Sequence, residues 1–81
     1  MQLDIYRRPE PHHKLSFLAV PSGKPLPQEV TDVDWLVEAQ GVELDTEAAH
    51  LPGYPIDGAA AQIREKGYAI TSLSHQVEAG G

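Results

Sequence analysis

The four histidines are the residues whose side chains could bind a metal ion. His12 and His13 are adjacent, and neither His50 nor His75 has a second histidine three or four positions away. On an extended segment adjacent side chains point to opposite sides, so His12 and His13 are poorly placed to hold one ion between them. A specific transition-metal site needs three or four convergent ligands, and the sequence has no cysteine to add. We therefore expect no metal site and no cofactor.

Catalytic chemistry would need a paired acid and base or an activated nucleophile. Asp32 and Asp34 would share one face of a strand, but no apolar run around them predicts the buried pocket that raises the pKa of a carboxyl group. Ser22 lies in Pro-Ser-Gly-Lys, which lacks the spacing of a phosphate-binding loop. Ser74 stands beside His75 near the C-terminus, where we expect no fixed geometry. We therefore do not expect an enzyme.

Acidic residues are concentrated in the middle of the chain. The whole sequence has a net charge of −6, and residues 25–57 contain eight Asp or Glu and no Lys or Arg. A surface of that sign repels phosphate backbones and attracts basic proteins. The alternative is that these acids only keep a small protein in solution. The candidate partner-binding residues in this stretch are Asp32, Asp34, Trp35 and Glu38.

A basic segment at residues 6–14 offers a second candidate surface. The side chains in it that could bind an anion, a small molecule or a labile metal are Tyr6, Arg7, Arg8, His12 and Lys14. Aromatic stacking combined with positive charge also binds single-stranded nucleic acid, but the acidity of the whole chain disfavours that partner. The basic segment and the acidic stretch could instead neutralise each other, either within one chain or across a weak homodimer.

Trp35 is the only tryptophan, and it stands among three acidic residues, Asp32, Asp34 and Glu38. As a core residue it would anchor a strand against a covering helix, since small domains depend on few large aromatic side chains. As a surface residue it would be an interface anchor inside an acidic rim. We expect the core position, and the fluorescence of Trp35 would distinguish the two.

Three segments have the hydrophobic pattern of strands. Gln2–Arg8 has apolar residues at alternate positions. Leu15–Val20 is largely apolar on both faces, which is typical of a central strand, and a hairpin with the first strand is the simplest pairing. Asp34–Ala39 is predicted to be the third strand, and Gly41 indicates a bulge or bend after it.

The stretch after the last proline is predicted to form a helix and then a strand. Asp57 is a favourable N-cap, and Ala59–Lys66 are mostly strong helix formers. Gly67 follows where a left-handed C-terminal residue belongs. Tyr68–Leu73 is rich in residues that favour strands, and we place this strand beside the first.

The order of these elements favours an α+β fold. We expect a small, mainly antiparallel sheet of three to four strands, one covering helix, and one short helix over Asp45–Leu51. We place a single domain at residues 1–73 and a disordered tail at residues 74–81. With no cysteine and no apolar run of membrane-spanning length, we expect a cytoplasmic monomer or weak homodimer without membrane contact.

Several stretches of the chain together resemble a family of short bacterial proteins of unknown function. They are MQLDIYRRPE, LSFLAVPSGKPLP, Asp34-Trp35, Gly41 to Asp45 and IDGAAAQIREKGYAI. The resemblance extends over nearly the whole chain, and it implies no activity, cofactor or catalytic residue. From the residues themselves we expect a non-enzymatic module that binds another protein through residues 25–57. Binding of a small molecule, an anion or a metal by residues 6–14 is the alternative.

Overall fold

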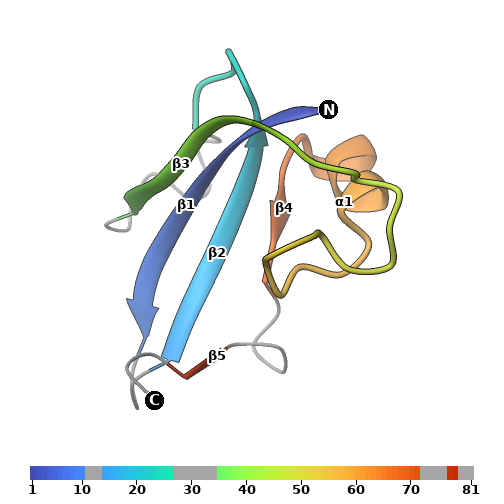
Figure 1. The fold of residues 1–81 in the computed structure, drawn as a ribbon. Helices are drawn as coiled ribbons and strands as arrows, with labels where there is room; N and C mark the ends of the chain where they lie inside the picture. The colour runs from blue at the N-terminus through green and yellow to red at the C-terminus, as the bar shows by residue number, and fades with distance from the viewer. Residues whose placement is uncertain (11–13, 27–34, 72–76, 79–81) are drawn as a thin grey trace.

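The computed structural model of the chain describes residues 1–10, 14–26, 35–71 and 77–78. Its elements are β1 (Gln2–Glu10), β2 (Lys14–Pro21), β3 (Leu36–Glu43), α1 (Ala59–Lys66), β4 (Ala69–Ile70) and β5 (Val77–Glu78). The strands form one sheet in the order β3-β1-β2-β4, and β5 pairs separately with β2. Every strand pair is antiparallel, and Figure 1 shows α1 beside β4. The fold is therefore a small α+β fold, as the element order predicts.

The hairpin of β1 and β2 forms the centre of the sheet. The two strands pair from Leu3 to Glu10 of β1, so both strands are longer than the sequence predicts. β1 continues through Pro9, which cannot donate a backbone hydrogen bond. The proline is tolerated because β3 pairs with β1 only as far as Arg7, so no described strand on that side needs the missing donor.

β2 is the central strand that its two apolar faces predict. Residues 16–20 are all buried, and β2 lies between β1 on one side and β4 and β5 on the other. β4 pairs with Leu18 and Ala19, whereas β5 pairs with Lys14 and Leu15. The expected position of the strand after the helix, beside β1, is wrong. β3 already occupies the second side of β1, so the chain after α1 pairs with β2 instead.

β3 begins at Leu36 and continues past Gly41, where the sequence predicts a bulge or bend. The expected start at Asp34 lies outside the described residues. The pairing with β1 changes register on both sides of Ile5, and Gly41 lies in one of these shifts. Gly41 has a φ of 63°, a left-handed conformation that glycine favours, and its N–H donates a 2.9 Å hydrogen bond to the Asp4 carboxylate. The bulge at Gly41 is therefore confirmed.

The short helix predicted over residues 45–51 is wrong, because this segment forms a turn. The Asp45 carboxylate accepts a 3.0 Å hydrogen bond from the N–H of Glu47, as an N-cap would, but the chain does not continue into a helix. The chain then folds back, and the N–H of Leu51 donates a 2.9 Å hydrogen bond to the carbonyl of Ile56. Residues 49–51 thus pair with residues 56–58 around an antiparallel bridge between His50 and Asp57, which a helix does not allow, and Leu51 and Ile56 are both buried.

α1 matches the predicted helix except at its N-terminus. The N-cap is Gly58 rather than Asp57, whose carboxylate contacts the ring of His50. The helix ends at Gly67, which has a φ of 87° and whose N–H donates a 2.8 Å hydrogen bond to the carbonyl of Ile63. This ending confirms Gly67 as the left-handed residue that the sequence predicts.

The outer edge of β4 is covered by one side chain of α1. The Gln62 amide donates a 3.3 Å hydrogen bond to the carbonyl of Ile70 and accepts a 3.0 Å hydrogen bond from the Ile70 N–H. The same amide donates a 2.8 Å hydrogen bond to the carbonyl of Asp57, just before the helix. Gln62 therefore occupies the place that a further strand would have beside β4.

The sheet carries an apolar cluster on each face. The cluster on the α1 face consists of Leu3, Ile5, Phe17, Ala19, Leu51, Ile56, Ala59 and Ala69. The cluster on the opposite face consists of Leu18, Val20 and Tyr68, with Tyr6, Leu26, Trp35 and Ile70 packed against it. Two clusters are possible because neighbouring residues of β2 point to opposite faces and both faces are apolar.

The C-terminal stretch contributes a short strand. Within residues 74–81, where the sequence predicts a disordered tail, the structure describes Val77–Glu78 as β5. The other residues of this stretch lie outside the described part of the chain, so the domain limit at residue 73 stays a prediction. None of the helical structure in the described ranges is long and apolar enough to cross a membrane.

Candidate interaction surface at the edge strand β3

β3 is the edge of the sheet at which apolar side chains are exposed. Leu36 is 48% exposed and Val37 is 55% exposed. β3 pairs with β1 on one side, and no other described strand pairs with its second side. The opposite edge, at β4, is covered by the amide of Gln62. An open strand edge with two neighbouring exposed apolar residues is a candidate site of protein contact.

The register with β1 places these two apolar side chains on different faces of the sheet. Leu36 is opposite Arg7, which alternates with the buried Ile5 and so lies on the α1 face. Val37 is opposite Tyr6 and lies on the other face. The α1 face therefore presents Leu36 together with Arg7.

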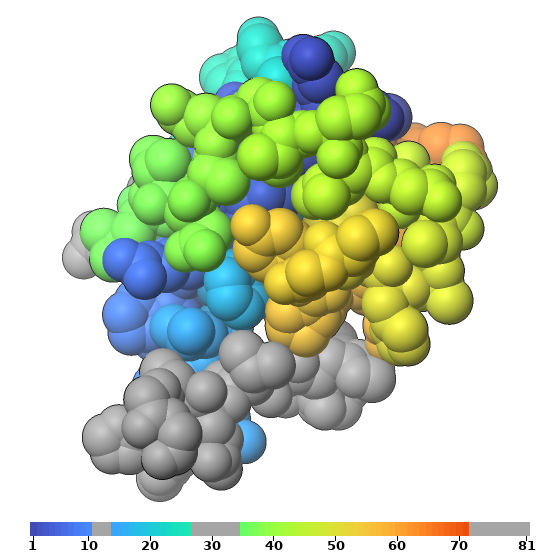
Figure 2. All heavy atoms as spheres, viewed as in Figure 1, coloured from blue at the N-terminus to red at the C-terminus, as the bar shows by residue number. Residues whose placement is uncertain are grey.

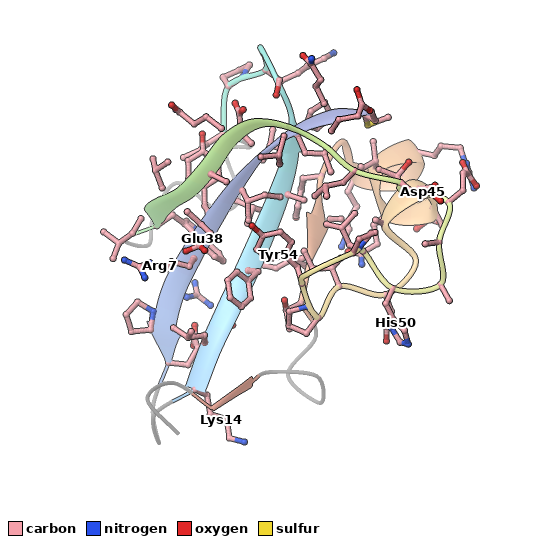
Figure 3. All side chains as sticks on the ribbon, viewed as in Figure 1. Arg7, Lys14, Glu38, Asp45, His50 and Tyr54 are labelled. Atoms are coloured by element: carbon pink, nitrogen blue, oxygen red, sulfur yellow. The ribbon has the colours of Figure 1, made fainter. Side chains whose placement is uncertain are left out.

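Glu38 follows these two residues at a second irregularity of β3. Between its pairs with Ile5 and Tyr6, β3 has one more residue than β1, and that residue is Glu38. A bulge of this kind redirects a side chain. The Glu38 carboxylate oxygen Oε1 lies 3.8 Å from Nε of Arg7, with the two side chains 36% and 46% exposed. Figure 3 shows both side chains in front of β1 and β3.

Tyr54 lies on the same side of the sheet as Glu38 (Figure 3). It comes from the loop before α1, and its ring packs on that of Phe17 with 5.3 Å between the ring centroids and 60° between the ring planes. Burial raises the pKa of the Tyr54 hydroxyl, and the negative charge of Glu38 raises this pKa further. The loop backbone is held by a 3.0 Å hydrogen bond from the Tyr54 N–H to the carbonyl of Leu51.

Three separate parts of the chain thus contribute to one small surface, which we call the Glu38 cluster: Arg7, Leu36, Glu38 and Tyr54. Figure 2 shows β3, in green, and the loop before α1, in yellow to orange, next to one another on this face of the molecule. The cluster combines a cation, an apolar side chain, an anion and an aromatic ring, all at least partly exposed. Arginine and aromatic side chains in such surroundings are common where proteins bind one another.

Several acids of residues 25–57 are already paired with positive groups or with histidine. The pairs are Arg7–Glu38, the N-terminal amine of Met1–Glu43, Arg64–Glu47 and His50–Asp57. Every partner in these pairs is at least one-third exposed. Exposed pairs of this kind stabilise a protein by about 0 to 1 kcal/mol. The cations of another protein can therefore replace them at little cost.

The four candidate partner-binding residues do not form one described surface. Asp32 and Asp34 lie outside the described residues. Trp35 is partly buried, and the expectation that it packs against the helix is wrong, because it belongs to the cluster on the opposite face. There the guanidinium of Arg8 lies 4.7 Å from the centroid of the Trp35 ring. Trp35 and Glu38 thus point to different sides of the sheet.

The basic segment is also divided between the two faces. Arg7 lies on the α1 face and pairs with Glu38, whereas Tyr6, Arg8 and Lys14 belong to positions on the opposite face. Arg8 forms an ion pair with Glu10, and His12 lies outside the described residues. These side chains therefore do not converge on a single anion site. Within the described ranges, no three His, Cys, Asp or Glu residues are placed to hold a metal ion.

Neither Leu36 nor Tyr54 stands in a motif that marks it as a binding residue. Leu36 stands in an apolar run that predicts an ordinary strand, and it is exposed because that strand lies at the sheet edge. Tyr54 lies between Gly53 and Pro55 and reaches Glu38 only because its loop folds back over β2. No local pattern indicates either position.

Comparison with curated proteins found no match to this chain. Comparison with solved structures likewise found none. A family model does match it, over residues 1–77, and the model is described as a family of unknown function, DUF6139. The match includes the Glu38 cluster and every described element except the final residue of β5. The chain therefore belongs to the DUF6139 family of unknown function.

Proposed function

We propose that the protein is a cytoplasmic, non-enzymatic interaction module that binds a basic protein through its acidic middle stretch, with β3 at the centre of the contact. The observation that carries the proposal is the exposure of Leu36 and Val37 beside Glu38, at the sheet edge where no further described strand pairs with β3. Apolar side chains at such a position gain most from being covered by a partner.

The exposed side chains of Leu36 and Val37 supply affinity for the partner protein. Fully burying a leucine or valine side chain contributes about 1.5 to 3 kcal/mol, and roughly half of Leu36 and of Val37 is still open to water. Covering both side chains would therefore contribute about 1.5 to 3 kcal/mol in total. That is enough to make them the main apolar contacts of a modest interface.

The charge distribution supplies the preference for a basic partner. Residues 25–57 carry eight acids and no Lys or Arg, and β3 itself carries Glu38 and Glu43 without a cation. Complementary charge raises the rate of association and disfavours partners of the same sign. The exposed ion pairs of these two glutamates, with Arg7 and the N-terminus, are weak enough to be exchanged.

The same geometry supports binding rather than catalysis. A general acid or base is usually tuned by burial in a site that excludes water. Glu38 is open to solvent and pairs with Arg7, and Tyr54 is only partly buried. Such a group is suited to hold a cation at a protein surface.

Affinity capture from a lysate of the source organism, at low and at raised salt, tests the proposal. We expect a partner that the native chain retains at low salt and releases at raised salt. The double variant Leu36→Ser, Val37→Ser and the triple variant Asp32→Ser, Asp34→Ser, Glu38→Ser should lose that partner. Glu65→Gln, a change at an exposed position of α1, should retain it.

Two results would contradict the proposal. One is a blank capture with the native chain at both salt concentrations. The other is equal capture by the native chain and the double variant, with nuclear magnetic resonance spectra showing that both are folded. Fractionation of cells that express a tagged chain tests the cytoplasmic location separately.

A further inference from the structure

The Glu38 carboxylate has unused capacity to accept hydrogen bonds. A carboxylate offers about four acceptor positions, and Arg7 is the one ion-pair partner of Glu38 in the described part of the chain. The 3.8 Å between Arg7 Nε and Glu38 Oε1 is longer than the roughly 2.7–2.9 Å of a charge-assisted hydrogen bond. Arg7 therefore lies near Glu38 without saturating it.

The surroundings of Glu38 suit a planar, delocalised cation. Tyr54 lies on the same side of the sheet, as Figure 3 shows, and its ring is held in place by packing on Phe17. Leu36 adds an exposed apolar side chain on the same face. A guanidinium can donate two parallel hydrogen bonds to a carboxylate and stack on an aromatic ring, whereas an ammonium acts as a compact point charge.

We infer that the Glu38 cluster binds an arginine side chain presented by a basic partner protein. This inference rests on the proposed function and names the chemical group that the partner contributes. The incoming guanidinium donates its hydrogen bonds to Glu38 and lies against Tyr54, and its hydrocarbon stem covers Leu36. Figure 3 shows Arg7, Glu38 and Tyr54 on one side of the sheet, where this site would form.

Arg7 competes with the partner's arginine for part of the Glu38 carboxylate. It is the same chemical group, and its exposed and loosely held contact with Glu38 is easily broken. Its presence reduces the fraction of molecules in which Glu38 is free, which lowers the apparent affinity by that fraction. Removing Arg7 should therefore strengthen binding, whereas removal of an ordinary interface residue weakens it.

Two other occupants of the β3 edge, a further strand and a second copy of this chain, are disfavoured. β3 has irregular pairing at Glu38 and at Gly41, and the exposed Pro9 lies on β1 beyond the end of β3. Bulges and prolines at an edge hinder the addition of a further strand. A second copy of this chain paired along β3 would join two strands that each carry Glu38 and Glu43 and no Lys or Arg. A side chain from a basic protein meets neither obstacle.

Nuclear magnetic resonance titration of the isotope-labelled chain with short peptides tests the inference. The probe is a blocked Leu-Arg-Leu peptide, and the controls replace its arginine with lysine or with uncharged citrulline. We expect the arginine peptide to bind most tightly, the lysine peptide more weakly and the citrulline peptide not measurably. The shifted resonances should include those of Leu36, Glu38 and Tyr54.

Variants of the chain separate this site from general attraction to an acidic protein. Glu38→Gln should abolish specific binding of the arginine peptide, and Tyr54→Leu should weaken it. Arg7→Ala should make binding roughly 1.5- to 5-fold tighter, the factor that a surface ion pair can contribute. Arg64→Ala is the matched control, because Arg64 forms a similarly exposed pair with Glu47 at 3.7 Å, and it should leave the affinity unchanged.

The inference is overturned if Arg7→Ala weakens binding or leaves it unchanged, or if Arg64→Ala strengthens it equally. It is also overturned if the arginine and lysine peptides bind alike, or if the native chain binds none of the peptides. Its failure is distinct from failure of the proposed function. A captured partner that is lost in the Leu36→Ser, Val37→Ser variant but retained by Glu38→Gln would preserve the interaction module and exclude the arginine site.

Discussion

Tyr54 reports on the Glu38 cluster through its hydroxyl group. Burial is the larger cause that raises its pKa above the usual value of 10.0, and the charge of Glu38 is the smaller one. Both causes disfavour the phenolate in the folded protein. The same proximity that makes Glu38 and Tyr54 a candidate arginine site therefore makes the titration of Tyr54 a local probe of that site.

We expect the folded protein to lose stability in alkaline solution because of Tyr54. Below pH 10 the hydroxyl is protonated in both the folded and unfolded chains, so it contributes no pH dependence. As the pH rises from 10 towards the raised pKa of the folded state, the unfolded chain releases the proton more readily, and the free energy of unfolding falls. Urea unfolding at a series of pH values measures this slope.

Two variants identify the source of that slope. Tyr54→Phe removes the ionising hydroxyl and should reduce the loss of stability above pH 10. Glu38→Gln should lower the pKa of Tyr54, and titration of phenolate absorbance would detect the change. A Tyr54→Phe protein that loses stability as steeply as the native chain would show that other groups cause the alkaline slope.

At the scale of secondary structure, the two edges of the sheet differ in what bonds to their outer backbone groups. Gln62 supplies both a donor and an acceptor to the backbone of Ile70, so the edge at β4 is occupied by a side chain. At β3, no described strand or side-chain amide has this role along the exposed Leu36 and Val37. This contrast is the structural reason for placing the partner at β3.

We expect Gln62→Ala to lower the free energy of unfolding by about 1 to 3 kcal/mol. The substitution removes the hydrogen bonds to both backbone groups of Ile70 and the bond to the carbonyl of Asp57. Partly buried polar groups that lose their partners cost about this much. Denaturant unfolding measures the change, with Glu65→Ala on the exposed side of the same helix as a control expected within about 0.5 kcal/mol. An equal effect of both substitutions would assign the loss to the helix itself.

The elements that could be predicted from the sequence are those with local causes. The apolar faces of β2, the helix formers of α1 and the glycine at its C-terminus each reflect the residues within one segment. The short helix at residues 45–51 does not form because residues 49–51 pair with residues 56–58, a pairing that the residues within the segment do not determine. The position of β4 beside β2 likewise depends on β3 having occupied the other side of β1.

The candidate site could be predicted only in part for the same reason. Glu38 and Arg7 are both recognisable as charged residues, but their pairing depends on a register shift that no glycine or proline marks at Glu38. Tyr54 reaches Glu38 through a loop whose path is set by the core beneath it. Asp32 and Asp34 lie outside the described residues, so their role stays a prediction.

At the scale of the whole molecule, the sheet joins segments from both ends of the chain. Met1 contacts Glu43 and the carbonyl of Leu44, and β5 pairs with Lys14 and Leu15 of β2. β4 and β5 thus pair with separate parts of β2. Because most pairs of β2 are with β1 and do not involve the C-terminal stretch, the hairpin and α1 should hold the fold without it.

We expect a chain that ends at residue 73 to fold, with a free energy of unfolding lower by about 1 to 2 kcal/mol. The truncation removes β5 and therefore its pairing with Lys14 and Leu15. The expected loss corresponds to a few intramolecular hydrogen bonds, each of which contributes about 0.5 to 1.5 kcal/mol. Urea unfolding measures the loss, and hydrogen exchange should show faster exchange near Lys14 and Leu15 with little change near Leu18 and Ala19, which pair with β4. A truncated chain that does not fold would place the domain boundary beyond β5, whereas unchanged stability and exchange would show that β5 adds nothing to the sheet. Since β5 is not part of the Glu38 cluster, the truncated chain should also bind the arginine peptide with the affinity of the full chain.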